Sequence, residues 1–528
     1  MFGAIFLVGW SLCALVIYSL ISSFVRRRQH ARLARQLGCE PPPILPTGFL
    51  GIRRAITMMK AQQKRQLQDA FLNERNAMQK MGKPCNTLKV EFLNQTLMVT
   101  YDPKNVQALL ATQFKDFALG PIRFGGFYPL LGTGIFSTDG SAWEHSRTML
   151  RPQFARSQVE DTAVEEYHLQ NFMQALQVGP DGCADVEDIQ TLFFRLTMDS
   201  ATEMLFGESL DTQLSEMPGA TVSMTRNGLR ERDFAAAFDK AQYIISEGFR
   251  LNELYWIYQG RELKNACKNV HDFADYFVKR ALNQEFGEKR TIEDGKKEKY
   301  VFLEALAADI RDPRKLRDEL LSILTAGRDT TAALLGYLWY SLAKDPVRYT
   351  KLRQTAIDHF GTYQHPKPIT FTGLKNCAYL QYCMNETLRL FPVVPLNSRR
   401  AVRDTSIPVG GGADGKSPVF VPKDTEVNYY VHVMHRMKEI WGPDVEDWKP
   451  ERFENRKSGW EYLPFNGGPR ICLGQQSALT KAGYTTVRLL QRFERVEPVD
   501  LEPQLRHKVT LTSRLYPGLH LRLFEASG

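Results

Sequence analysis

The sequence predicts a mainly α-helical domain with small β-sheets, preceded by one membrane-spanning helix. Long periodic apolar segments occupy the chain from Asn105 to about Lys344, and a further helical pattern runs to Leu390, where two nearby prolines stop it. Strand-like alternation is confined to short stretches before residue 102 and after residue 400. The first 25 residues carry no charged side chain, which separates them from the rest of the chain.

The segment Phe2–Val25 predicts a transmembrane anchor. As an α-helix it would reach roughly 36 Å, enough for the ~30 Å hydrocarbon core of a bilayer. A cleaved signal peptide would instead carry positive charge before a shorter apolar run. A buried core helix is a weaker alternative, because few soluble helices run this long without charge. Arginines after the span hold that side in the cytosol; they are Arg26, Arg27, Arg28, Arg32 and Arg35.

Three parts follow from these patterns. Residues 1–25 form the anchor, residues 26–48 a basic and proline-rich linker, and residues 49–528 one domain without a second linker or an internal repeat. Within that domain, LKVEFLNQTLMVTYDP predicts a hairpin that ends near Asp102. The C-terminal VTLTSRLYPGLHLRLF predicts a strand, a turn at Pro517-Gly518 and another strand. Three consecutive glycines at 410–412 lie between strand-like segments, which indicates a hairpin rather than a phosphate-binding loop.

Charge and cysteine content exclude several classes of function. The net charge of +9 is spread along the chain, and no nucleic-acid motif accompanies it, so we expect no nucleic-acid partner. A basic face for an acidic membrane or an acidic partner protein fits better. The 8 cysteines are scattered without a CxxC pair, which disfavours a disulfide framework and a structural zinc site. Reduced thiols on the cytosolic side follow.

One short loop concentrates glycine and proline around a single thiol. In PFNGGPRICLGQQ, residues 464–476, Gly467 and Gly468 allow backbone angles that other residues avoid, and the proline after them fixes a bend. The apolar run after Gly474 indicates the start of a helix. A thiol just before a helix start lies near the positive end of the helix dipole, which favours the thiolate. We therefore expect this loop to present Cys472 as a sulfur anion.

A polar motif interrupts a helix that should cross the interior. AGRDTT, residues 326–331, lies within a helix predicted over about Leu316–Lys344 that is apolar nearly all round. Burying Asp329 and Thr330 costs free energy unless they are paired or hydrated. The threonine hydroxyl can bond to the carbonyl of Ala326 and loosen the helix. Such a site leaves room for a diatomic ligand, water and a proton relay; a satisfied polar pair that bends a core helix is an equal alternative.

A buried ion pair is predicted in the segment NETLRLFP. Glu386 and Arg389 are three residues apart on one helix, with apolar neighbours around them. Such a pair neutralises itself and fixes local geometry. Arg452, in PERF, can join Glu386 and complete a network of three charged groups.

Candidate groups for binding a carboxylate lie in other segments. In WEHSR, Trp143 and Arg147 are four residues apart and so share a helix face, where an indole N–H beside a guanidinium suits a carboxylate. The spacing alone is a weak signal. Arg399 and Arg470, the latter two residues before Cys472, are further anion-binding candidates.

Taken in order, these motifs resemble the cytochrome P-450 superfamily. Each short motif is common, but the ordered set is highly specific, and it covers about residues 40 to 528. The motifs are Trp143-x-x-x-Arg147, Ala326-Gly-x-Asp-Thr330, Glu386-x-x-Arg389, Pro450-Glu-Arg452-Phe and Phe465-x-x-Gly468-x-Arg470-x-Cys472-x-Gly474. The resemblance implies the cytochrome P-450 fold, with residues 49–528 as a haem-binding monooxygenase domain.

The resemblance also assigns roles to individual residues. Cys472 would be the proximal thiolate of haem b, donating electron density that favours O–O cleavage, and Phe465 would pack on the sulfur side of the ring. Asp329 and Thr330 would deliver protons to the oxygen site. The positions that match binders of the haem propionates are Trp143, Arg147, Arg399 and Arg470. The positions that match the structural triad are Glu386, Arg389 and Arg452.

The partners implied are NADPH-cytochrome P-450 reductase, which would pass on electrons from NADPH, and cytochrome b5. The resemblance and the anchor together imply an endoplasmic reticulum membrane protein, single-pass, with the catalytic domain facing the cytosol. An electron-independent haem-thiolate isomerase or dehydratase is an alternative, which the intact acid–threonine pair disfavours. A protein that only holds haem or lipid is a third class.

A narrower resemblance points to the substrate. WEHSRTMLRPQF, LTAGRDTTA, MHRMKEIWGPD and LPFNGGPRICLGQQ are similar to the fungal microsomal hydroxylases of alkanes and fatty acids. This implies terminal hydroxylation of n-alkanes or long-chain fatty acids; a monooxygenase of fungal secondary metabolism acting on another lipophilic substrate is the alternative. Each residue expected to line an apolar substrate pocket has an ordinary core role as a nearly equal alternative. These residues are Phe124, Phe127, Leu130, Leu131, Val393, Val394 and Leu515.

Overall fold

The computed structural model describes residues 2–92, 95–154, 163–217, 231–283, 301–500 and 504–526. The chain divides into two units. The first unit comprises Met1–Thr57, Phe71–Ala118 and Ser398–Tyr430, and the second comprises Met58–Ala70, Leu119–Asn397 and Val431–Gly528.

A mixed sheet forms the main β-structure of the first unit. Among the described residues it has five strands in the order β1-β2-β8-β5-β3. β1 and β2 are antiparallel, which confirms the hairpin predicted before Asp102, and β2 is parallel to β8. β6 and β7 form a separate antiparallel hairpin that contains the three glycines, as predicted. The strands are β1 (Thr87–Phe92), β2 (Gln95–Thr100), β3 (Phe117–Ala118), β5 (Asn397–Ala401), β6 (Thr405–Gly411), β7 (Ser417–Val421) and β8 (Glu426–Tyr429).

The helices of the first unit are α1 and α4, Pro103–Gln107. Helix α1, Phe2–Gln36, covers the predicted anchor and continues through the basic segment. The side chains of residues 2–9, 11–13 and 16 lie outside the described part. No helix within the described residues is long and apolar enough to cross a membrane. The anchor over Phe2–Val25 therefore stays a prediction.

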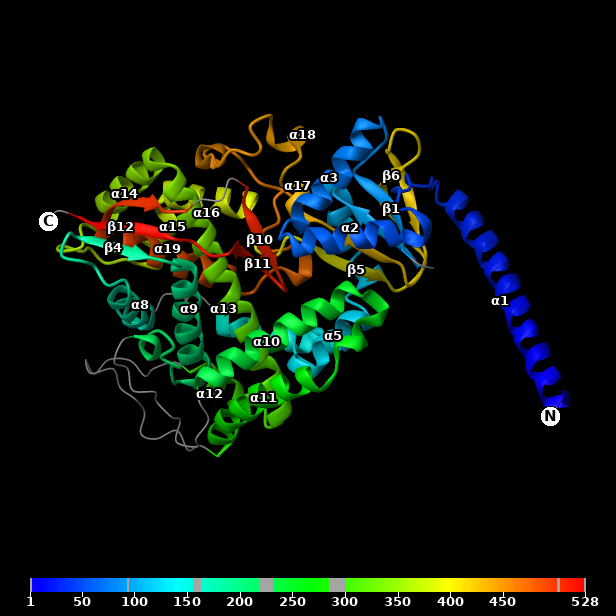
Figure 1. Cartoon of the computed structure of the whole chain (residues 1–528), viewed down its shortest axis with the longest axis horizontal. Coiled ribbons are helices and arrows are strands. Elements are labelled where there is room, and N and C mark those ends of the chain that lie inside the picture. Colours follow the sequence, from blue (N-terminus) through cyan, green and yellow to red (C-terminus); the bar gives the residue numbers. More distant parts are fainter. Residues whose placement is uncertain are drawn as a thin grey trace. The chain divides into compact units, whose positions relative to one another are not determined.

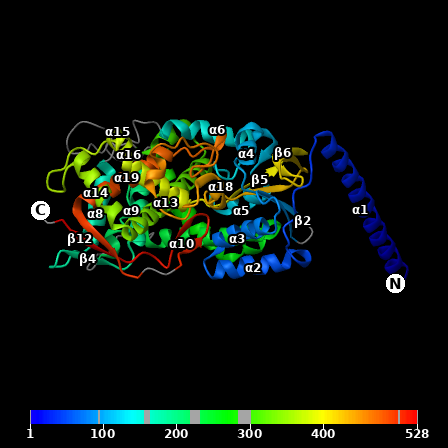
Figure 2. The same cartoon turned by 90° about the horizontal axis from the view of Figure 1, so that it is seen from above.

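Helices make up most of the second unit (Figure 1 and Figure 2). Two further helices, α2 (Ile52–Gln63) and α3 (Leu67–Lys80), contribute residues to both units. The helices of the second unit are α5 (Pro121–Leu131), α6 (Gly140–Leu150), α8 (Ala163–Ala175), α9 (Ile189–Phe206), α10 (Glu231–Arg250), α11 (Arg261–Leu282), α12 (Phe302–Asp309), α13 (Pro313–Lys344), α14 (Pro346–Phe360), α15 (Phe371–Asn376), α16 (Ala378–Leu390), α17 (Val431–Met434), α18 (Lys438–Trp441) and α19 (Gln475–Arg492).

The long interior helix predicted over about Leu316–Lys344 is α13. It begins three residues earlier than expected because Asp312 caps it: its carboxylate accepts the N–H of Arg314 at 2.9 Å. Pro313 takes the first helical position, where its missing N–H removes no bond. The prediction that α16 ends at Leu390 is confirmed.

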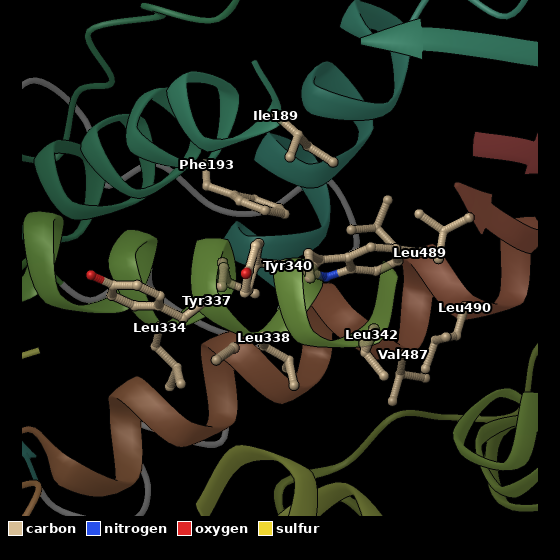
Figure 3. Packing of buried hydrophobic residues seen from close by; sticks show 14 of the residues in the cluster. Ile189, Phe193, Leu334, Tyr337, Leu338, Tyr340, Leu342, Val487, Leu489 and Leu490 are labelled. Atoms are coloured by element: carbon tan, nitrogen blue, oxygen red, sulfur yellow. The ribbon is translucent and has the colours of Figure 1, made fainter. Parts of the chain in front are cut away.

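α13 is buried between helices that lie far apart in the sequence. Figure 3 shows Phe193 of α9 and Leu338 of α13 in the same cluster as Val487 and Leu489 of α19. Each of these four side chains is 0 % exposed. The apolar pattern around α13 is thus explained by contacts on several sides, since a helix that is hydrophobic all round must be covered all round.

Two small sheets complete the second unit. The described strands are β4 (Cys183–Val186), β12 (Leu521–Glu525) and β9 (Phe493–Pro498), in the order β4-β12-β9, and the pair β10 (Arg506–Val509) and β11 (Ser513–Tyr516).

Both strands predicted around Pro517-Gly518 are present as β11 and β12, but they belong to different sheets. The connection does not close a hairpin because it binds the start of α9: Asp188 accepts the N–H of Leu519 at 3.0 Å, and Leu519 O accepts the N–H of Ile189.

Truncating Leu338 to alanine should destabilise the second unit. The side chain is fully buried, so Leu338→Ala should lower the free energy of unfolding by about 2–5 kcal/mol. Leu254→Ala is the matched control, because that leucine is 43 % exposed and its truncation should change stability by about 0.5 kcal/mol or less. Thermal unfolding followed by circular dichroism measures both. Equal shifts in the two variants would contradict the position of Leu338 in the core.

Candidate functional site

The cysteine loop is closed by its own backbone. Cys472 N–H donates to the carbonyl of Phe465 at 3.0 Å, and Gly468 and Asn466 have positive φ angles of 66° and 61°. Positive φ is inexpensive for glycine and tolerated by asparagine, which explains these residues at the bend. Helix α19 begins at Gln475, three residues after the cysteine, as predicted. Cys472 itself is exposed, so the loop presents its thiol to a ligand.

The electrostatics of Cys472 differ from the expectation of a ready thiolate. The residue keeps accessible surface but lies deep among protein atoms, and this burial raises the pKa of the thiol above its ordinary value. The backbone N–H of Gly474 and the guanidinium of Arg147 lower the pKa, as expected of a helix start, but burial outweighs them. The protein alone therefore favours the protonated thiol. A metal ion bound to the sulfur would lower the pKa of the thiol and so favour the thiolate.

Two guanidinium groups and an indole meet where α6 contacts this loop, Trp143 and Arg147 from α6 and Arg470 from the loop itself. Trp143 is buried, and the guanidinium carbon of Arg470 lies 4.3 Å from the centre of its ring. Arg147, one turn further along α6, lies 5.8 Å from the same ring and donates to the carbonyl of Ile471 at 3.0 Å. The structure thus brings Trp143, Arg147 and Arg470 together next to Cys472. Burial lowers the pKa of Arg147, but the guanidinium stays charged.

Arg470 binds a carboxylate that sequence analysis missed. Its Nη2 donates to Asp139 Oδ1 at 2.6 Å and to the carbonyl of Thr138 at 3.0 Å. Asp139 also accepts the N–H groups of Leu119 and Gly120, each at 3.0 Å. This aspartate therefore joins the cysteine loop to the segments before α5 and α6. The signal available in the sequence was an aspartate placed just before the helix that carries Trp143.

Arg399 lies in the first unit, on β5. It is 2 % exposed, donates to the carbonyl of Ser398 at 2.7 Å and lies 5.8 Å from the ring centre of Tyr429. Its role as a propionate ligand stays a prediction.

The AGRDTT motif forms an accessible strip on a buried helix. Between Asp318 and Ala343, all residues of α13 are buried except four, which are Thr325, Ala326, Gly327 and Thr330. A Cβ atom at Gly327 would meet no atom within 4 Å. Thr330 Oγ1 donates to Ala326 O at 2.6 Å, the bond that the sequence predicted. Small residues and one hydroxyl therefore border open space on an otherwise covered helix.

Asp329 points into the protein beside this strip. It is 8 % exposed, and burial raises the pKa of its carboxyl group, while Arg328 opposes the rise from 3.4 Å. Arg328 also contacts Asp239 of α10. Arg514 and the side-chain amide of Gln242 lower the pKa further. Sequence analysis gave Arg328 no role, because a single arginine between motif residues carries no spacing signal.

The predicted triad is present as a hydrogen-bonded group. Glu386 and Arg389 are both 0 % exposed, and two bonds of 2.7 and 2.8 Å join them. Arg452 Nε lies 3.3 Å from Glu386 Oε1, which also accepts the N–H of Lys449 at 3.0 Å. Arg452 binds Asp444 as well. Buried charges of this kind are tolerated because each has several partners, and they fix α16 to the segment before the cysteine loop.

The predicted lining residues lie in two groups. Ser513 N–H donates to the carbonyl of Val393 at 2.8 Å, which brings β11 to the segment after α16. Phe124 is 40 % exposed and Val394 is half-buried. The buried members are Phe127, Leu130 and Leu131 of α5, with Val393 and Leu515.

One cavity lies apart from these residues. It has a volume of about 340 Å³ and lies between α10, the 3₁₀ helix Asn252–Tyr258 and the start of α11. None of the residues predicted to line a substrate pocket borders it.

The chemistry of these groups fits an iron porphyrin. Cys472 supplies one accessible sulfur ligand, and Arg147, Arg470 and the Trp143 indole supply donors for the porphyrin carboxylates. The strip on α13 supplies small side chains and a hydroxyl, as a site for a diatomic ligand requires.

Comparison with known proteins gives the same assignment. The family model for cytochrome P450 matches residues 51–517. A protein from Fusarium named "Cytochrome P450 monooxygenase g430" is 47% identical over 99% of this chain and 90% of its own length. "Cytochrome P450 52A12" from Debaryomyces hansenii is 44% identical over 90% of this chain and 91% of its own length. "Cytochrome P450 52A1" from Candida tropicalis is 46% identical over 83% of this chain and 80% of its own length.

The family model spans most of the chain, and the three relatives align along 83% to 99% of it. The resemblance found in the motifs is therefore confirmed, and the chain belongs to the cytochrome P450 family.

Proposed function

We propose that this cytochrome P450 is a haem-thiolate monooxygenase that hydroxylates n-alkanes or long-chain fatty acids at the terminal carbon. One oxygen atom from O₂ would enter a C–H bond of the lipophilic substrate. The observation that carries the proposal is Cys472, exposed in a closed loop that Arg147 contacts at Ile471 and that itself carries Arg470.

The resemblance to the family assigns the residues that would hold haem b. Cys472 would bind the iron, Phe465 would pack on the sulfur side of the ring, and Trp143 would donate its indole N–H to a propionate. Arg147, Arg470 and Arg399 would be the cationic propionate partners. When bound, haem supplies the activation of O₂ for attack on an unactivated C–H bond, aided by thiolate donation.

The chain's own contribution to proton delivery lies on α13. Burial raises the pKa of Asp329, so this carboxyl group holds a proton more readily than an exposed aspartate. Thr330 Oγ1, bonded back to Ala326 O, keeps a lone pair that can accept a hydrogen bond from a neighbouring water. We assign Asp329 as the proton donor and Thr330 as the group that orients water.

Electrons would come from NADPH through NADPH-cytochrome P-450 reductase, with cytochrome b5 as a second donor. An isomerase or dehydratase of the same cofactor would turn over without NADPH, and a haem- or lipid-holding protein would give spectral shifts but no product. The Asp329–Thr330 pair supports the monooxygenase, because reducing one atom of O₂ to water consumes protons that this pair would deliver.

The substrate proposal is based on the resemblance to alkane and fatty-acid hydroxylases and on the apolar character of α5. Phe127, Leu130 and Leu131 are buried, and they carry no charge. A primary C–H bond is stronger than its internal neighbours, so terminal attack requires the pocket to hold the chain end in place. Selection by positioning, not by bond strength, would determine the product.

Replacing the proposed iron ligand should abolish the spectrum. The reduced wild-type protein with carbon monoxide should show the red-shifted absorption of thiolate ligation, and Cys472→Ser should lose it. Cys183→Ser is the matched control, since Cys183 is another free cysteine of the second unit. Retention of the thiolate spectrum in Cys472→Ser would overturn the assignment of the ligand.

The anchor should place the protein in the endoplasmic reticulum membrane with its catalytic domain in the cytosol. Protease added to sealed microsomes should then digest the domain, and removal of residues 2–25 should release part of the protein from the membrane. Detergent-opened microsomes serve as the control for protease activity. Protection of the domain in sealed microsomes would reverse the topology.

Affinity for straight chains should rise with length. Each buried CH₂ contributes about 0.8 kcal/mol, which is about four-fold in dissociation constant, until the pocket is filled. Spectral titration with dodecane and with C12 to C18 fatty acids measures this series, and incubation with NADPH and reductase should give terminal alcohols or diacids. Turnover of polycyclic or aromatic substrates alone would exclude the proposed substrate class and leave the haem-thiolate chemistry intact.

A further inference from the structure

Two adjacent carboxylates on α13 bind the segment that joins α5 to α6. Asp318 Oδ2 accepts the N–H of Thr133 at 2.9 Å, and Glu319 Oε2 accepts the N–H of Ile135 at 3.2 Å. Ser146, on α6, donates its hydroxyl to Glu319 Oε1. We call Asp318 and Glu319 with these three partners the carboxylate clamp. Sequence analysis missed it, because its partners are about 180 residues away in the chain and two of the bonds go to backbone.

The backbone of the clamped segment is shaped for this contact. A Cβ atom at Gly132 would lie 2.0 Å from Asp318 Oδ2, and one at Gly134 would lie 2.2 Å from Ser322 Oγ. Gly132 also has a φ of +50°. Only glycine allows so close an approach of the backbone to the carboxylate. The sequence Gly-x-Gly before α6 therefore allows this segment to pack directly against α13.

The clamp leads directly to the proposed cofactor-binding groups. Ser146 lies on α6 between Trp143 and Arg147, and it is buried. Arg147 in turn binds the carbonyl of Ile471, the residue before Cys472. A short chain of contacts therefore joins α13, which carries the oxygen-site motif, to the loop that carries the proposed iron ligand.

We propose that Glu319 is a positioning residue that holds α6, and with it Trp143 and Arg147, in register with α13. This inference rests on the proposed haem-thiolate function, because the groups it aligns are the proposed haem ligands. Glu319 is 0 % exposed and both of its carboxylate oxygens are used, one by Ser146 and one by the backbone, so it acts through other residues.

The charge on Glu319 changes close to neutral pH. Burial, the largest effect, and the charge of Asp318 raise the pKa of Glu319, while Ser146, the Ile135 N–H and Lys315 lower it, and the resulting pKa is about 6. The folded pKa lies above the unfolded value, so the stability that this group contributes is present at low pH and is lost as the pH rises through about 6. The fold therefore keeps an ionised carboxylate there at neutral pH although protonation would stabilise it.

The other half of the clamp also faces titratable groups. Burial raises the pKa of Asp318, which the Thr133 N–H, Arg317 and His271 of α11 oppose. Burial lowers the pKa of His271, whose Nε2–H donates to the carbonyl of Leu130 at 2.9 Å. Asp318 and His271 are therefore further titratable groups beside the α5–α6 segment, and the Glu319→Gln variant assigns a pH step there to Glu319.

Opening of the clamp frees the Ile135 amide and also hydrates Glu319, which favours its ionised form because the pKa is raised in the closed state. Hydrogen exchange at Ile135, corrected for the intrinsic rate, should therefore become faster as the pH rises through about 6 in the wild type. Glu319→Gln can keep both contacts, since its amide oxygen accepts from Ile135 and its NH₂ donates to Ser146. It carries no charge, so its exchange should show no such step.

Loss of both contacts should loosen the cofactor. In Glu319→Leu, release of haem to an excess of a haem-binding apoprotein should be about ten-fold faster than in the wild type, the scale of one lost buried charge-assisted bond. Glu319→Gln should release haem at close to the wild-type rate. Glu144→Leu is the matched control, since it makes the same substitution on the exposed side of α6.

Several outcomes separate this inference from the proposed function. Wild-type retention of haem in Glu319→Leu, with the Ile135 amide unprotected, would overturn the positioning role. If Glu319→Leu does not fold, the pH step in the wild type and its absence in Glu319→Gln still decide, and a wild type without the step would overturn the inference. Cys472→Ser should lose the thiolate spectrum and keep the protection of Ile135, so failure of the iron-ligand assignment would be seen in that variant alone.

Discussion

The free-energy cost of carrying polar groups into the interior on α13 is the constraint on which the site depends. This helix is covered by α9 and α19 along its C-terminal half, where its side chains are apolar. Its N-terminal half carries Asp318 and Glu319 into the same interior. Buried carboxylates remain charged only where donors face them, and here the donors come from the backbone before α6 and from Ser146.

Satisfying those carboxylates determines the position of α6, and α6 determines which groups stand beside the cysteine loop. Arg147 of α6 donates to the loop backbone at Ile471, and Arg470 of the loop donates to Asp139, which lies just before α6. The two contacts cross-link helix and loop in both directions. A loop of this composition would otherwise be mobile, since glycine restricts the backbone least, so the sulfur of Cys472 is held in place by charge-assisted bonds from its neighbours.

The sequence predicted those features that depend on local pattern. α13, α16 and the hairpin β1–β2 follow from periodicity and capping residues, and the bond from Thr330 to Ala326 follows from i,i+4 geometry. The pairing of strands that are far apart in the chain could not be predicted from local pattern. β12 joins β4 and β9 instead of β11 because Asp188 binds the connecting segment, and an aspartate that caps one helix gives no signal that it also holds a distant turn.

The same division applies to the site. Cys472, Trp143 and Arg147 belong to motifs with fixed spacing, whereas Glu319, Asp139 and Arg328 act through partners that only the fold brings near. The sequence predicts a lowered pKa for Cys472, because the helix start after it is visible in the sequence. The structure gives a raised pKa, because burial outweighs the helix start and cannot be seen in the sequence.

Burial of Asp329 changes the pKa of its carboxyl group in the direction that the proposed role requires. An exposed aspartate would be ionised at neutral pH and could not donate a proton, but burial raises the pKa of Asp329 and shifts it toward the protonated form. Arg328 limits that shift, because its guanidinium lies 3.4 Å from Asp329 Oδ1. Arg328 also binds Asp239, whose side chain is 50% exposed, so part of its charge is already neutralised. On the proposed assignment, this carboxyl group beside Thr330 would hold a proton more readily than an exposed aspartate and release it more readily than one without Arg328 nearby.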